Sequence, residues 1–158
     1  MRHFIAYHNP ERMGYPYRAS PHHFFYTNKP VSHLVGNTVW VVSFAGTQRD
    51  YALVGCFQVT EAGDATEGGF KHSVAGNGPT FRPWIRVKDR VWFPRLLQVT
   101  GNFGLGLSQV KDRSVIEGLI EAAAEAGYSL ESASTGTARA RTKEFYFPPR
   151  STGSSLTN

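Results

Sequence analysis

The stretch "VGNTVWVVSFAGTQRDYALVGCFQVT", Val35 to Thr60, is the most strongly patterned part of this chain. Its two apolar runs around a short polar turn predict a hairpin of strands over residues 37–45 and 51–60. Successive side chains of a strand point to opposite faces, and both sets are apolar here, as in the run Val39 to Val42. An antiparallel strand of this kind lies inside a fold, with both of its faces covered.

Gly55 interrupts the second apolar run of the hairpin. Glycine inside a strand marks sharp curvature or the close approach of another group. We therefore expect an α+β fold that is mainly β: a small antiparallel β-barrel with a filled interior and one or two flanking helices. A bend of the barrel is the favoured explanation of Gly55, and a ligand close to it is the alternative.

The residues around the hairpin predict several shorter strands. A first strand over residues 3–8 ends at the turn signal Asn9-Pro10. Residues 10–30, rich in proline and histidine, indicate mostly ordered loop, and residues 61–69 indicate a second loop. Between Phe70 and Leu97 we expect two or three short strands, separated by glycine and proline.

One clear helix follows near the end of the chain. Ser114 with Glu117 three residues later forms a capping box, and Gly127 ends the apolar stripe that follows. The polar residues 151–158 predict a disordered tail. We expect a single domain over residues 1–150.

Composition restricts the class of protein. With 158 residues, of which 41% are hydrophobic and 18% charged, the chain has the composition of a folded globular domain. It has no apolar run long enough to span a membrane, and its N-terminus does not resemble a signal peptide. The single cysteine, Cys56, lies in an apolar strand and indicates a buried thiol in a reducing compartment. We expect a cytoplasmic protein.

Positive charge is both abundant and segregated. The net charge is +5 and the pI near 9.6, which favours nucleic acid as a partner. Acids gather between residues 61 and 67 and along the predicted helix. The segment from Lys71 to Arg95, called the central segment, contains a single acid, Asp89. Its basic residues are Lys71, Arg82, Arg86, Lys88, Arg90 and Arg95.

The hairpin resembles a known family. Its glycine turn, its apolar strand and the run "LVGCFQV" are similar to the hairpin of PUA-like barrels such as EVE and ASCH domains, which are related to the YTH and SRA readers of modified bases. The resemblance extends to "FFYTNKPVSHL", where EVE domains carry pocket-lining residues. The segment "WFPRLLQVTGNFGLGL" is similar to one in prokaryotic proteins that join such a domain to an HNH nuclease. Asn37 stands where the family turn has aspartate.

The resemblance implies a non-catalytic module that binds nucleic acid, DNA rather than RNA, and recognises a modified base such as a methylated cytosine or adenine. Such a reader flips the base out of its stack and holds it between aromatic side chains. The candidate base-binding residues are Tyr26, Asn28, Trp40, Ser43, Trp84 and Trp92. The basic residues of the central segment, Lys71 to Arg95, are the candidate phosphate contacts. A nuclease partner or fused module would make the chain the recognition part of a modification-dependent restriction system.

A purely structural role is the alternative for several of these residues. A tryptophan within an apolar strand, as at Trp40, is more often part of the core. The alternation of Arg86 and Lys88 with Ile85 and Val87 also fits a plain solvated strand face.

Two further functions fit the same sequence. One is an RNA-binding module. The other is a small nucleoside or nucleotide hydrolase on the same barrel, with Lys71 and Glu67 as its candidates. The histidines His22, His23 and His33 could in principle coordinate a metal, but the histidines of this chain form no recognised metal motif. We expect neither a metal nor another cofactor.

Overall fold

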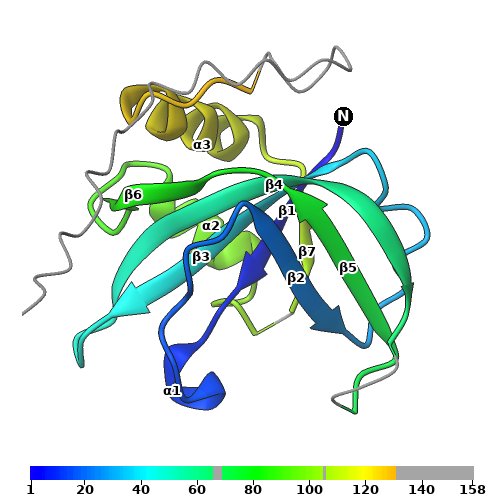
Figure 1. The fold of residues 1–158 in the computed structure, drawn as a ribbon. Helices are drawn as coiled ribbons and strands as arrows, with labels where there is room; N and C mark the ends of the chain where they lie inside the picture. The colour runs from blue at the N-terminus through cyan, green and yellow to red at the C-terminus, as the bar shows by residue number, and fades with distance from the viewer. Residues whose placement is uncertain (66–68, 105, 131–158) are drawn as a thin grey trace, which may run out of the picture.

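The computed structural model describes residues 1–65, 69–104 and 106–130. Within these ranges the chain forms a mainly β, α+β fold of seven strands and three helices (Figure 1). In chain order the elements are β1 (His3–Tyr7), α1 (Pro10–Met13), β2 (His22–Thr27), β3 (Thr38–Ala45), β4 (Asp50–Asp64), β5 (His72–Asn77), β6 (Thr80–Arg86), α2 (Phe93–Val99), β7 (Ser108–Val110) and α3 (Arg113–Glu125).

The predicted hairpin is confirmed as β3 and β4. Thr38 pairs with Gln58 at one end of the antiparallel ladder and Ala45 with Asp50 at the other. Strand β4 continues to Asp64, into the segment expected to be a loop. This length lets β4 pair with three strands, because β3 lies along one side while β6 and β5 divide the other between them.

The strands form one curved sheet in the order β2-β5-β4-β3-β1-β7, with β6 pairing the first half of β4. Strands β1 and β3 are parallel, and the other pairs are antiparallel. Among the described residues, β2 and β7 each pair with one neighbour, so these ladders describe an open sheet and not a closed barrel. In Figure 1 the sheet curls strongly, with α2 and α3 on one side of it.

Both faces of the central hairpin are covered, as the sequence predicted. Trp40, Val42 and Leu53 belong to an outer core that also contains residues of α2 and α3. Val39, Val41 and Val54 belong to an inner core on the other face, completed by Val31 and Leu34 and by residues of β5 and β1. The apolar residues at the two alternating sets of positions therefore pack into two separate cores, one on each side of the sheet.

Gly55 lies where the sheet is irregular. The register of β4 against β6 shifts between Leu53 and Gly55. A β-carbon at Gly55 would lie 2.8 Å from the carbonyl oxygen of Pro79 and 3.0 Å from Cε1 of His23. That carbonyl accepts a hydrogen bond from the Cys56 amide at 3.1 Å. Gly55 is thus approached closely by other parts of the same chain. This supports a structural reason for the glycine, as in the favoured explanation, and leaves no room for a ligand at this position.

Some local predictions were wrong. Residues 10–30, expected as loop, contain α1 and β2, and residues 93–99, expected in a region of strands, form α2. Helix α1 is capped by the Asn9 side chain, which accepts hydrogen bonds from two amides of the first turn. The predicted strands over residues 3–8 and within 70–97 are confirmed as β1, β5 and β6.

The C-terminal helix is confirmed, but its cap is a different residue. The side chain of Asp112, and not that of Ser114, accepts hydrogen bonds from the amides of Ser114 and Val115. The carboxylate also binds the Ser114 hydroxyl at 2.6 Å. Two residues with capping ability lie close together here, and the acidic one occupies the N-cap position. The tail predicted over residues 151–158 lies outside the described residues.

Candidate functional site

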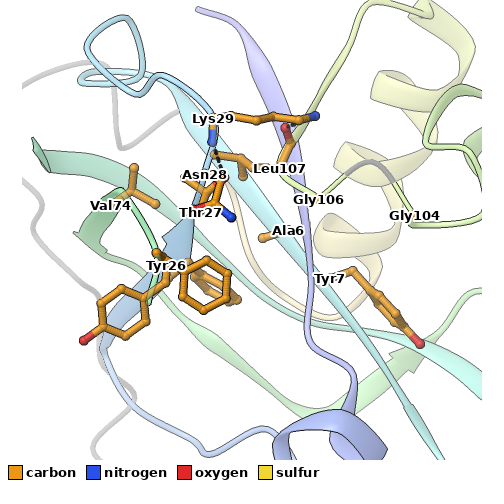
Figure 2. A pocket seen from close by; sticks show the side chains of 12 residues that line it. Ala6, Tyr7, Tyr26, Thr27, Asn28, Lys29, Val74, Gly104, Gly106 and Leu107 are labelled. Carbon is orange, nitrogen blue, oxygen red and sulfur yellow. Dashed lines mark hydrogen bonds between the residues drawn. The ribbon is translucent and has the colours of Figure 1, made fainter. Parts of the chain in front are cut away.

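A pocket of about 290 Å³ lies between one end of β2 and strand β1, which are not paired with each other. It is bordered by residues of β5 and by the segment before β7, so it sits between the two open ends of the curved sheet. Figure 2 shows Tyr26 on one side of this hollow and Tyr7 on the other. The lining residues include Phe25, Tyr26, Thr27, Asn28, Lys29, Phe70, Val74 and Leu107.

Two exposed aromatic residues, Tyr26 and Phe70, border the pocket at the β2 edge of the sheet. The rings of Tyr26 and Phe70 are stacked, with centroids 5.8 Å apart and an interplanar angle of 13°. Both remain accessible, Tyr26 with 37% and Phe70 with 44% of its surface exposed. Flat, exposed rings beside a hollow offer a surface on which a planar ligand can stack.

Polar groups follow directly after Tyr26, where β2 ends. Asn28 accepts a hydrogen bond from the backbone amide of Lys71 through Oδ1 at 3.0 Å. The Lys29 ammonium donates to the carbonyl of Leu107 at 3.1 Å, which bridges the hollow, as Figure 2 shows. In the described residues the amide nitrogen of Asn28 has no partner, so it is a hydrogen-bond donor at the pocket.

A buried histidine anchors the start of β2. His23 of β2 stacks on Phe57 with centroids 4.9 Å apart, and Phe25 lies parallel to the same ring. Its Nδ1 accepts from the Tyr17 hydroxyl, and its Nε2 donates to the Gly78 carbonyl at 3.0 Å. Burial lowers the pKa of His23 and raises the pKa of Tyr17. The imidazole is therefore neutral and fixed, which holds the start of β2 in place.

Two of the predicted base-binding residues lie at this pocket, namely Tyr26 and Asn28. Trp40 and Ser43 do not, and both have 0% exposed surface. The Trp40 indole donates to His3, and the Ser43 hydroxyl donates to the His8 carbonyl at 2.9 Å. Neither can contact a base, because β3 is central and covered on both faces. Assigning these two residues to the site was wrong.

The other two predicted residues, Trp84 and Trp92, also lie apart from the pocket. Trp92 packs so closely over Gly118 of α3 that a β-carbon there would overlap its ring. Trp84 packs against the inner core and lines a second, more open hollow of about 520 Å³ with Tyr15 and Phe44. Arg18 lies over the Tyr15 ring and Arg49 over the Phe44 ring. Tertiary structure therefore divides the predicted aromatic set among three places.

The basic run is partly neutralised by acids distant in the sequence. Arg86 pairs with Asp50 at 3.1 Å, and Arg95 pairs with Asp112 at 2.7 Å. Arg90 forms two hydrogen bonds with Glu125, which lower the pKa of that carboxyl. These three arginines are therefore bound to carboxylates, so they do not form the free phosphate track that the sequence predicted.

The other three predicted phosphate contacts, Lys71, Arg82 and Lys88, are exposed and have no ion pair within the described ranges. Of these, Lys71 joins the pocket region through the hydrogen bond of its amide to Asn28. Arg82 lies on β6, which pairs with the half of β4 that β5 leaves free. Lys71 alone of the basic run therefore lies near the pocket, while Arg82 is on a different part of the sheet.

Sequence reasoning did not select most residues of the pocket, and Lys29, Phe25 and Phe70 are three instructive examples. Lys29 and Phe25 lie in the same short segment, "FFYTNK", as the two residues that were selected, so this signal was available. Phe70 carried no such signal. Its place beside Tyr26 depends on the pairing of β2 with β5, in which Tyr26 opposes Ser73.

We also searched the described residues for a metal site, a reactive thiol and the hydrolase pair. These residues contain no group of three or more potential metal-ligating side chains. Burial raises the pKa of the Cys56 thiol to about 12, so it remains protonated. Glu67, which was paired with Lys71 in the hydrolase hypothesis, lies outside the described residues. None of the helices in these ranges is long and apolar enough to cross a membrane.

Comparisons with known proteins give no further identification. No family model matches the chain, and no curated protein and no solved structure matches it. The resemblance to PUA-like domains therefore remains a prediction from the sequence, and the site is interpreted from its own geometry.

Proposed function

We propose that this chain is a PUA-like nucleic-acid-binding module that takes one unstacked base into the pocket at the end of β2. We propose that the ligand is a modified base in DNA, and methylated cytosine and methylated adenine are the first candidates. The observation that carries the proposal is the combination at one pocket of stacked, exposed rings at Tyr26 and Phe70 with a donor at Asn28.

The size and chemistry of the pocket support this ligand. Its volume of about 290 Å³ is at the lower end of the range for small-molecule sites, so it suits a single base and not a dinucleotide. A base offers two flat faces for stacking and a polar edge for hydrogen bonds. The Asn28 amide nitrogen can donate to an acceptor on that edge, while apolar Val74 and Phe25 give a surface for a methyl group.

Charge supports a nucleic acid over an isolated base. The chain carries a net charge of +5, and Lys29 and Lys71 lie beside the pocket. Exposed cations at the mouth can contact the phosphates on either side of a flipped nucleotide. The binding module itself needs no catalytic group. A nuclease partner or fused nuclease module would supply cleavage, if the chain serves a restriction system.

The test uses matched DNA strands with and without a single modified base, and Asn28→Asp as the main variant. Aspartate keeps the oxygen that accepts the Lys71 amide but replaces the donor group with a carboxylate. Asn77→Asp is the matched control, because this exposed residue of β5 likewise uses its Oδ1 as an acceptor, toward His22. The two variants change the net charge equally.

We expect the wild-type protein to bind one modified strand more tightly than its unmodified counterpart. Asn28→Asp should reduce that preference by roughly 5- to 150-fold, the range of one good base contact, and Asn77→Asp should leave it intact. Equal binding of modified and unmodified strands by the wild type would refute the base-reading proposal. Tighter binding of the matched RNA would favour the RNA-binding alternative.

A further inference from the structure

Three exposed aromatic rings gather on the outer face of the sheet at its β2 edge. Phe24 is 50% exposed, although it lies in the middle of a strand, and it contacts Tyr26 with centroids 4.9 Å apart at 82°. Tyr26 in turn stacks with Phe70. We call Phe24, Tyr26 and Phe70 the aromatic platform.

Most cross-strand neighbours of the platform are small, and the exception is the exposed Glu61 of β4, which lies opposite Ala75. Ala75 of β5 lies opposite Phe24, Ser73 lies opposite Tyr26, and Gly63 of β4 lies opposite Ser73. The helices α2 and α3 belong to the outer core over β4, β6, β3 and β1. In Figure 1, β2 and β5 lie away from α3, and no helix of the described residues packs over this half of the face.

We propose that the aromatic platform binds single-stranded nucleic acid, by stacking the unpaired bases that flank the nucleotide in the pocket. This inference rests on the proposed function, since Tyr26 and Phe70 belong to both the pocket and the platform. It adds that the preferred ligand is an unpaired strand, because only unpaired bases expose faces to rings on a sheet surface.

Composition and position favour a single strand of nucleic acid over a protein partner. The platform consists of three aromatic rings, with Lys71 directly after Phe70 and Glu61 on the β4 side. A stable protein interface buries about 800 Å² on each side, far more than three half-exposed rings provide. The platform is also continuous with the pocket. A nucleic-acid chain that leaves the pocket past Tyr26 meets the Phe24 ring next, because Phe24 contacts Tyr26 on β2.

The test measures fluorescence anisotropy of a labelled oligothymidylate and of a hairpin duplex with the full-length protein. Phe24→Ala removes a ring that does not line the pocket, and Phe24→Trp keeps a stacking surface. Val91→Ala is the control, since Val91 is an exposed apolar side chain outside the platform, with 98% of its surface accessible. Light scattering on each variant reports the oligomeric state.

We expect the wild type to bind the single strand more tightly than the duplex. Loss of one stacking ring typically weakens binding by about 5- to 150-fold, and for the exposed Phe24 we expect the lower part of that range. Phe24→Trp should bind as the wild type does, and Val91→Ala should change nothing.

The outcomes separate this inference from the proposed function. Binding of single strands that depends on Phe24 but ignores base modification would support the platform and refute base reading. Preference for a modified duplex that is unaffected by Phe24→Ala would refute the platform alone. A wild-type dimer that dissociates in Phe24→Ala, without any change in strand binding, would assign the rings to a protein contact and overturn the inference.

Discussion

Replacing Gly55 with alanine tests the account of the central strand most directly. The new β-carbon would lie 2.8 Å from the Pro79 carbonyl oxygen and 3.0 Å from the His23 ring. Neither group can withdraw freely. The carbonyl holds the Cys56 amide at 3.1 Å, and the ring is fixed by its hydrogen bonds to Tyr17 and to Gly78. The added methyl group must therefore strain the junction of β4 and β6.

The expected magnitude follows from two opposing effects. Alanine is more favourable than glycine inside a strand by about 0.5–1 kcal/mol, because it restricts the unfolded chain more. Overpacking of a tight interior costs about 1–3 kcal/mol. We expect a net loss of about 1–2 kcal/mol in the free energy of unfolding, which corresponds to a fall in Tm of about 2–8 °C for a chain of this size.

The assay is urea denaturation of the wild type and of two variants. Gly63→Ala is the matched control, because Gly63 lies in the same strand and a β-carbon there meets no atom within 4 Å. It should gain up to about 0.5–1 kcal/mol. If Gly55→Ala proves as stable as Gly63→Ala, the close approach of Pro79 and His23 is not what requires glycine, and the reasoning fails.

Two further predictions concern stability and pH. Because burial lowers the pKa of His23 below 6.5, the unfolded chain binds its proton more readily than the folded one, and stability should fall as the pH drops below about 6.5. His3 contributes in the same direction, so denaturation midpoints of His23→Phe across this range should show a weaker, but not abolished, dependence. Hydrogen bonds from Ser114 and Arg95 lower the pKa of Asp112 to about 2. The stability that the Asp112 carboxylate gives the folded chain should therefore be complete above about pH 4 and be lost toward pH 2. Asp112→Ala should lower Tm at neutral pH while Asp112→Asn, which keeps the cap, should lower it less; equal effects would argue against the capping role.

Much of the fold could be predicted because the signals are local. Apolar residues at both alternating positions from Val39 to Val42 identified a strand buried on both sides, and the two cores of the structure confirm it. The helix before Gly127 was likewise clear from its periodicity. Helix α2 was missed because its proline at the first turn was interpreted as a strand breaker, although proline is equally compatible with the start of a helix.

The sequence by itself determined the central hairpin, the mainly β class and the "FFYTNK" segment that contributes Tyr26 and Asn28 to the pocket. Tertiary structure alone decided which aromatic residues are accessible. It buried Trp40, packed Trp92 on Gly118 and placed Phe70 beside Tyr26, through strand pairings that join distant parts of the chain. It also neutralised arginines such as Arg90 with acids such as Glu125. A run of charges shows where cations occur along the chain, whereas their availability depends on which carboxylates the fold brings within reach.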